Sequence, residues 1–260
     1  MWLVVIVLGI VEGLTEFLPI SSTGHLILAG HLLSFTGPRA DTFEIFIQLG
    51  AILAVAWEFR ASLWDLGRRQ RRDAGARAFV ANVALAFMPA AVVGLAAGSA
   101  IKAQLFGPAT VATALIAGGV AIWLIETWIP ERTPVDVEKL TWRQALGVGL
   151  AQIAALCPGV SRSAATIMGG MICGLDRRAA TEFSFFLALP TLGAATVYDL
   201  LKSLDILSRA DIAPFALGLL ASFVSALLVI RGFLRYVRTH DFRPFAIYRV
   251  VLGLLVLAVL

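Results

Sequence analysis

The sequence predicts an all-α polytopic membrane protein built as an inverted-topology repeat, with six transmembrane helices plus two re-entrant helix-turn-helix hairpins. The first observation behind this prediction is composition: 59% of the 260 residues are hydrophobic, 15% are charged, and the mean hydropathy is +0.88. Soluble domains hold only about 45–50% apolar residues. The second is a series of long apolar stretches, and the third is a pair of apolar segments that proline and polar residues interrupt.

Each transmembrane helix is predicted from an apolar stretch that can cross ~30 Å of hydrocarbon, which takes about 20 helical residues. Short charged clusters separate the stretches, as is typical of loops between membrane spans. The six predicted spans are Thr42 to Trp57, Phe79 to Ile101, Val111 to Ile129, Thr181 to Leu201, Ala213 to Ile230 and Phe245 to Leu260.

Two other segments, Trp2 to Leu33 and Ala145 to Leu175, have apolar arms that are too short to span. Irregular backbone survives at membrane depth only where protein or a water-filled cavity surrounds it, so both segments are predicted to be re-entrant hairpins. The polar centre of the first hairpin contains Glu12, Glu16, Pro19, Ser21, Ser22, Thr23 and His25. The centre of the second contains Pro158, Gly159, Ser161, Arg162, Ser163 and Thr166.

The distribution of basic residues predicts the orientation of the chain. With the loop after Trp57 on the cytoplasmic side, fifteen Lys and Arg residues fall inside and four fall outside. This is a strong positive-inside bias, and it accounts for the net charge of +4 without a nucleic-acid partner. The four outer residues are Arg39, Lys102, Lys202 and Arg209. The first hairpin then enters from the outer side and the second from the inner side.

An offset of about 140 residues superposes Ser21 on Ser161, Phe43 on Phe183, Phe46 on Phe186 and Leu49 on Leu189. The chain therefore reads as one membrane domain of two repeats, residues 1–130 and residues 131–260. Each repeat is a hairpin plus three spans, and an odd number of crossings gives the two copies opposite orientations. The tips of the two hairpins are then expected to meet near the bilayer centre.

Glu12 and Glu16 are four residues apart, which puts their carboxylates on one helical face with roughly 6 Å between the Cβ atoms. Two like charges repel there, so either one is protonated or a cation or Arg162 lies between them. The alternative is that the two groups only pair within the helix bundle. Charged groups inside a membrane usually form ion pairs and usually take part in function, which favours a functional site.

Both turns carry the features of an anion-binding site. Pro19 ends one half-helix, and Ser21, Ser22 and Thr23 can cap the next, which leaves free N–H groups at its positive end. Ser161 and Ser163 follow Gly159 in the same way, and glycine allows close approach of a ligand. Taken singly, such serines more often cap helices, but Arg162 between two of them suits a tetrahedral oxyanion.

Five other polar or thiol side chains complete the sequence prediction. His25 is expected to act as a proton donor, a base or a nucleophile, and Gln48 is expected to line the cavity. Arg249 is expected to extend to the cytoplasmic boundary. Cys157 and Cys173 are interpreted as small buried hydrophobic residues.

Two stretches resemble the signatures of the bacterial undecaprenyl-diphosphate phosphatase family, the bacitracin-resistance proteins. They are Glu12-Gly-Leu-Thr-Glu-Phe-Leu-Pro-Ile-Ser-Ser-Thr-Gly-His25 and Pro158-Gly-Val-Ser-Arg-Ser-Ala-Ala-Thr166. The similarity covers nearly the whole chain, including the segments from Phe43 to Gly50 and from Phe245 to Arg249.

The resemblance implies hydrolysis of undecaprenyl diphosphate to undecaprenyl phosphate and inorganic phosphate, which recycles the lipid carrier of peptidoglycan synthesis. It also implies a divalent cation, Mg²⁺ or Ca²⁺, held by Glu12 and Glu16. Arg162, Ser161, Ser163 and Thr166 would bind the phosphates, and the nucleophile would be Ser22, His25 or an activated water.

The main alternative from the sequence is a lipid-phosphate transporter or flippase, because inverted repeats with broken helices also build alternating-access carriers. A carrier needs binding groups but no nucleophile, so the glutamate pair beside Ser22 and His25 favours the enzyme. A structural or channel protein would leave Arg162 without a purpose. The expected location is the bacterial inner membrane, with a site that opens to the outer side. Membrane lipids are expected to contact the protein, and a homodimer is one assembly that the sequence allows.

Overall fold

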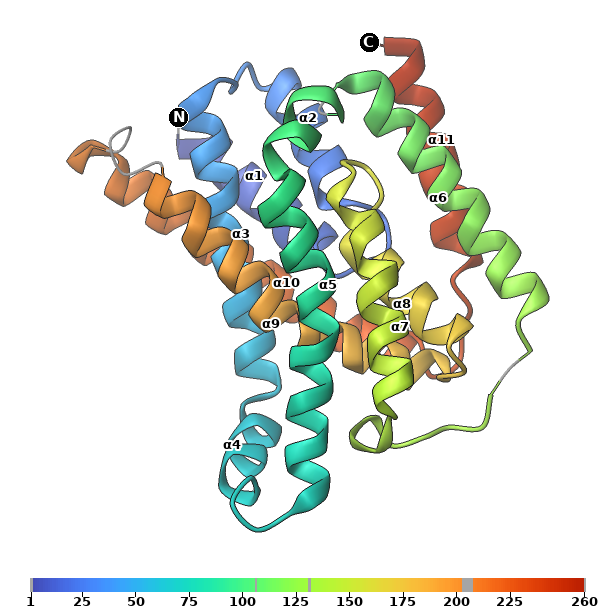
Figure 1. The fold of residues 1–260 in the computed structure, drawn as a ribbon. Coiled ribbons are helices and arrows are strands. Elements are labelled where there is room, and N and C mark those ends of the chain that lie inside the picture. The colour runs from blue at the N-terminus through green and yellow to red at the C-terminus, as the bar shows by residue number, and fades with distance from the viewer. Residues whose placement is uncertain (1, 106, 131, 203–207, 260) are drawn as a thin grey trace.

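The regular structure is helical throughout the described part of the chain, which comprises residues 2–105, 107–130, 132–202 and 208–259 of a computed structural model (Figure 1). The α-helices are α1 (Trp2–Thr15), α2 (Ser22–Leu32), α3 (Pro38–Glu58), α4 (Arg60–Arg69), α5 (Ala74–Leu105), α6 (Pro108–Trp128), α7 (Trp142–Gln152), α8 (Arg162–Ile172), α9 (Arg177–Lys202), α10 (Ile212–Tyr236) and α11 (Arg243–Val259). The 3₁₀ helices of the described residues are η1 (Val137–Lys139), η2 (Ile153–Leu156) and η4 (Arg209–Asp211).

Within these residues, five helical segments are long and apolar enough to cross a membrane. They are Pro38–Glu58, Ala74–Gly98, Pro108–Trp128, Arg177–Lys202 and Arg209–Tyr236. Large apolar side chains such as Leu95, Leu228 and Leu255 are more than half exposed, as expected for surfaces that face lipid rather than water. The chain is therefore a multi-pass membrane protein, as the hydropathy predicts.

The observed helix bounds differ from the predicted spans mainly at the ends. The helix expected from Thr42 begins at Pro38, and the one expected from Phe79 begins at Ala74, because polar first turns continue helices that hydropathy alone truncates. The helix α4 was not predicted, since its sequence is largely polar and it follows α3 directly. Some predicted positions lie outside the described residues. They are the ends of the predicted repeats and of the last span, Met1, Glu131 and Leu260, and the side chain of Lys102.

Both interrupted segments form two short helices joined by a turn, as predicted. The first consists of α1 and α2, and the second of α7, η2 and α8. The helices after the turns, α2 and α8, are each 11 residues long and start 140 residues apart. Ser21 and Ser161 precede them with the same φ of 72°, and each accepts a hydrogen bond from the N–H three residues on. The two turns are thus local copies of one backbone design.

Packing between the halves places the turns in the middle of the bundle. The helix α1 runs parallel to α10, since Gly9 contacts Gly218 while Gly13 contacts Ser222. The helix α7 packs on α5 through Gly149, the repeat mate of Gly9. Each hairpin therefore packs against a long helix of the opposite half.

The helices α3 and α9 are antiparallel. The end of α3 meets the first half of α9, because the Phe59 and Phe186 rings are 4.9 Å apart, whereas Gln48 bonds to Thr196 further along. In Figure 1, α3 descends to α4 and α5 returns beside it, while α6 and α11 form a pair at one side. These opposed directions are those that an inverted repeat requires.

Candidate active site

The two turns face each other across a cavity of about 130 Å³. Residues from α2, α3, η2, α8, α9 and both turns form its wall, so it belongs to neither half alone. The lining residues are Glu16, Ser21, Ser22, Thr23, Gln48, Ala155, Cys157, Pro158, Gly159, Ser161, Arg162 and Leu192. Eight of the twelve residues predicted to form the site line this cavity, and the other four, Glu12, His25, Ser163 and Thr166, do not.

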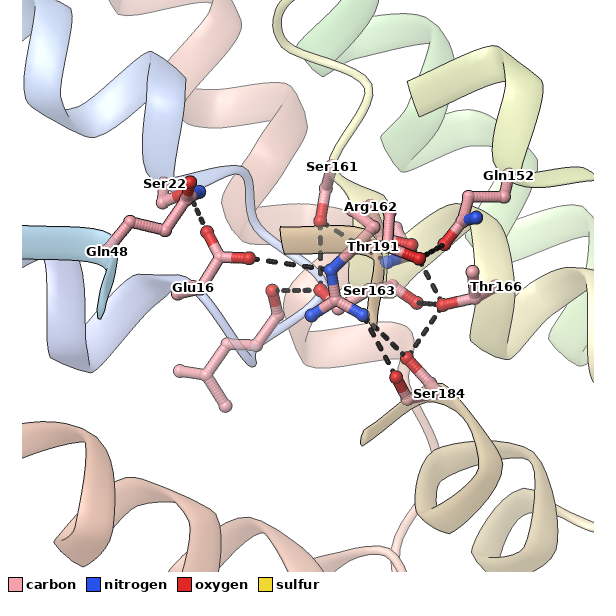
Figure 2. A network of polar contacts seen from close by, with 12 residues as sticks. Glu16, Ser22, Gln48, Gln152, Ser161, Arg162, Ser163, Thr166, Ser184 and Thr191 are labelled. Atoms are coloured by element: carbon pink, nitrogen blue, oxygen red, sulfur yellow. Dashed lines mark hydrogen bonds and ion pairs between the residues drawn. The ribbon is translucent and has the colours of Figure 1, made fainter. Parts of the chain in front are cut away.

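Glu16 connects the chemistry of the two turns (Figure 2). Its Oε2 accepts a hydrogen bond of 2.5 Å from Ser22 Oγ, and its Oε1 lies 3.5 Å from Arg162 Nε. The side chains of Arg162 and Glu16 are 8% and 4% exposed, so water screens this ion pair little. An acid, a base and a hydroxyl from opposite halves therefore share one buried site.

The guanidinium of Arg162 is held from the other side by α9. Its Nη1 donates to the carbonyl oxygen and hydroxyl of Ser184, at 3.1 and 3.3 Å, and Thr166 Oγ1 lies 2.7 Å from the same hydroxyl. The Phe17 ring lies 5.7 Å from the guanidinium carbon. The Nη2 atom of Arg162 is buried and has no partner among the described residues. The side chain is thus fixed in place with one donor free for a ligand.

Ser161 and Ser163 tie the turns together. Ser163 Oγ donates a 2.6 Å hydrogen bond to Leu18 O in the first turn and lies 3.0 Å from Ser161 Oγ. Ser163 and Thr166 are fully buried and do not line the cavity, so they support the wall rather than form it.

Each turn also presents free backbone donors. In the described structure the N–H groups of Ser22 and Thr23, and those of Arg162 and Ser163, donate to no acceptor on the backbone or on a side chain. These are the first N–H groups of α2 and α8, where the helix dipole is positive. Two helix N-termini directed into one cavity form a site for an anion with several oxygens.

Glu12 lies on α1, four residues before Glu16, which follows the end of that helix. It is 1% exposed, and its Oε1 has no hydrogen-bond partner in the part of the chain described. Throughout that part, no three His, Cys, Asp or Glu side chains converge as a closed metal site. Two buried carboxylates with an unpartnered oxygen nevertheless fit a Mg²⁺ or Ca²⁺ ion, since Mg²⁺ typically binds one or two carboxylates and completes its shell with water and phosphate.

His25 is placed differently from the other predicted residues. Its Nδ1 lies 2.7 Å from Ser21 O and its Nε2 lies 2.7 Å from Tyr248 Oη, so both ring nitrogens are engaged. The ring stacks on Tyr248 of α11 and is not among the groups that line the cavity. Gln48, in contrast, lines the cavity and accepts a hydrogen bond of 3.1 Å from Thr196.

The expectation for Arg249 is wrong. Instead of reaching the cytoplasmic boundary, Arg249 is 0% exposed and donates only to backbone carbonyls. Two of these belong to the turns: Pro19 O at 3.2 Å and Gly159 O at 2.9 Å. Hydropathy cannot predict this, because the oxygens that bind the guanidinium come from three separate parts of the chain.

The whole chain can be compared with known proteins. It matches the family described as bacitracin resistance protein BacA over residues 5–255. The chain belongs to this family. An undecaprenyl-diphosphatase of Methylococcus capsulatus is 54% identical over 258 residues, which cover 99% of this chain and 94% of the relative. Undecaprenyl-diphosphatases of Nitrosospira multiformis and Ectopseudomonas mendocina are 55% and 52% identical, covering 97% of this chain and 92% of each relative.

In this member of the bacitracin resistance family, three residues of the site were missed from the sequence. Ser184 holds Arg162, Cys157 lines the cavity, and Gln152 is buried with an unpartnered Nε2. The repeat offset was a signal for two of them, because Gln152 is the repeat mate of Glu12 and Ser184 is that of Glu44. No signal in the sequence marked Cys157.

Proposed function

We propose that this chain hydrolyses undecaprenyl diphosphate to undecaprenyl phosphate and inorganic phosphate, and so recycles the lipid carrier of peptidoglycan synthesis. The observation that carries the proposal is the meeting of Glu16, Ser22 and Arg162 at a cavity between two helix N-termini. The relatives above are named for this enzyme rather than for a carrier. A hydroxyl bonded to a carboxylate is also a group that transport does not need.

Ser22 is proposed as the nucleophile. Its Oγ attacks the terminal phosphorus, its proton passes to Glu16, and the bond from that phosphorus to the bridging oxygen breaks to release undecaprenyl phosphate. Water then hydrolyses the phosphoserine and releases inorganic phosphate. The 2.5 Å hydrogen bond to Glu16 and the position of Ser22 on the cavity wall support Ser22 over His25, whose ring nitrogens are both engaged.

Charge on the diphosphate would be stabilised by Arg162 and by the free N–H groups of both turns. Gln48, Thr23, Ser21, Ser161 and Gly159 line the cavity and would surround the phosphates. Glu12 and Glu16 would hold Mg²⁺ or Ca²⁺. The ion, when bound, would neutralise part of the negative charge of the substrate and leaving group.

The proposed membrane arrangement is an inverted repeat of residues 1–130 and 131–260, with α11 as the sixth span and both hairpins re-entrant. The shared φ of Ser21 and Ser161 and the antiparallel α3 and α9 support the repeat. The positive-inside count supports an orientation in which the first hairpin enters from the outer side. In the bacterial inner membrane, which is the proposed location, the cavity would then open to the periplasm. A homodimer stays a prediction from the sequence.

Phosphate release from undecaprenyl diphosphate by the purified protein tests the function. Glu16→Gln removes the proton acceptor and Arg162→Ala removes the phosphate-binding cation, so each should lower kcat about 100-fold or more. Arg231→Gln, which breaks an ion pair with Glu58 far along α10, should leave turnover unchanged. Normal turnover by folded Glu16→Gln and Arg162→Ala proteins would reject the catalytic assignment.

A further inference from the structure

We propose that Arg249 is a positioning residue that holds the two turns in register and thereby sets the geometry of the phosphate site. The inference goes beyond the proposed hydrolysis and rests on it for its kinetic part. Arg249 lies on α11, outside both hairpins, and touches neither Glu16 nor Ser22. Its guanidinium instead binds the backbone from which the cavity is built.

The two turn carbonyls that Arg249 binds are repeat mates. Nη1 donates to Pro19 O and Nη2 donates to Gly159 O, and these residues are 140 positions apart, like the capping serines that follow them. One planar guanidinium thus fixes the distance between equivalent points of the two hairpins. Only a rigid fork with several donors can do so, which is a property of arginine and not of lysine.

The same guanidinium is anchored to α6. Nη2 also donates to Ala114 O at 3.1 Å, and Nε donates to Leu115 O at 3.4 Å. Gly118, one turn further along α6, leaves the space that the guanidinium occupies, because a Cβ there would collide with Nη2. The turns are consequently fixed to the α6–α11 pair as well as to each other.

The charge of Arg249 supports a role at an anion site. Among the described residues no carboxylate lies within ion-pair distance of it, whereas the buried carboxylates of Glu126 and Glu16 each have a cationic partner. A buried charge held only by carbonyl dipoles costs several kcal/mol at membrane depth unless something compensates it. A diphosphate at the nearby helix N-termini would supply the missing negative charge.

A purely structural contact would stabilise the fold without affecting the reaction selectively. The kinetic test therefore compares kcat and KM for undecaprenyl diphosphate in Arg249→Met and Arg249→Lys, with Arg231→Gln as the matched control. For Arg249→Met we expect kcat to fall about 100-fold while KM rises no more than about tenfold, because displaced turns weaken the transition state more than the bound substrate. Arg249→Lys keeps the charge without the fork and should fall between Arg249→Met and the wild type.

Anion occupancy can be measured without turnover through Cys157, which lines the cavity. In a Cys173→Ser background, pyrophosphate should slow the reaction of Cys157 with a small methanethiosulfonate reagent. Arg249→Met should need about tenfold more pyrophosphate for the same protection. Arg231→Gln should need the same amount as the wild type.

The two readouts separate the failure of this inference from failure of the proposed function. If pyrophosphate protects Cys157 of the wild type but the protein releases no phosphate, the proposed hydrolysis is rejected. The positioning role of Arg249 is then tested by the protection measurement alone. A folded Arg249→Lys or Arg249→Met protein with wild-type kcat and wild-type protection would overturn the inference. If Arg249→Met does not fold, Arg249→Lys decides the matter.

Discussion

At the scale of single residues, the site is defined by which polar atoms have partners and which do not. Arg162 uses Nε and Nη1 on Glu16 and Ser184 and keeps Nη2 free, while Glu12 keeps Oε1 free. An unpaired buried donor costs about 1–3 kcal/mol, so such atoms persist where a ligand completes them. The pair of free atoms, one donor and one acceptor, fits a phosphate together with a cation.

The nucleophile can be identified by comparing Ser22 and His25. We expect Ser22→Ala to lower kcat about 1,000-fold, because it removes the attacking oxygen. We expect His25→Gln to lower kcat about tenfold or less, because its contacts to Ser21 and Tyr248 position the helix rather than reach the cavity. The measurement is phosphate release under saturating substrate, and a larger loss in His25→Gln would favour the histidine as nucleophile.

The cation can be tested through Glu12. Chelation should abolish turnover, and Mg²⁺ or Ca²⁺ should restore it. Since Glu12 offers an unpartnered carboxylate oxygen, Glu12→Gln should raise the cation concentration for half-maximal activity about tenfold. Glu58→Gln, at the exposed Arg231 pair, is the matched control. Full activity of the wild type in excess chelator would exclude a dependence on the ion.

At the scale of elements, the two turns depend on backbone conformations that few residues adopt. Ser21 and Ser161 both have φ near +72°, a region that costs non-glycine residues about 1–3 kcal/mol. Each serine offsets part of this cost by capping the following helix. Gly159 has φ of 91° and lies against the backbone of Val111 in α6. The second turn thus needs glycine for both its conformation and its packing.

Gly159→Ala tests this requirement. A Cβ there would lie 2.6 Å from Val111 O, so we expect the free energy of unfolding in detergent to fall by about 1–3 kcal/mol and turnover to fall with it. The control is Gly193→Ala in α9, where a Cβ meets nothing within 4 Å and alanine favours the helix. Equal stability of the two variants would show that the second turn tolerates a side chain.

The same elements show what local sequence can predict. Pro19, Gly159 and the serines after them marked both turns, because their constraints act within a few residues. The helix α4 was missed because its polar sequence gives no membrane signal, although it continues directly from α3. Helix starts were placed late for the same reason, since hydropathy reports burial in lipid and not hydrogen bonding.

At the scale of the whole molecule, each hairpin packs on a long helix of the other half. Gly9 in α1 meets Gly218 of α10, and Gly149 in α7 meets Ala86 of α5. Close helix contact through small residues is a usual means of association in membranes. The site therefore exists only when both halves are assembled, and neither half is expected to bind phosphate alone.

The orientation of the whole molecule can be tested with single cysteines. In a protein whose Cys157 and Cys173 are replaced by serine, we expect a cysteine at Ser208 to react with an impermeant maleimide in intact cells. A cysteine at Arg71 should react only after the membrane is opened, because the positive-inside count places that loop in the cytoplasm. The reverse pattern would invert the proposed topology and place the cavity toward the cytoplasm.

The sequence by itself determined the membrane class, the approximate spans, the two turns and most residues of the cavity, because hydropathy, proline and capping serines act over short stretches of chain. Only the tertiary structure decided which groups meet: Glu16 with Arg162, His25 with Tyr248, and Arg249 with both turns. The physical reason is that these partners lie on different helices. Their distances are set by how the helices cross and pack, which the order of residues along one helix does not specify.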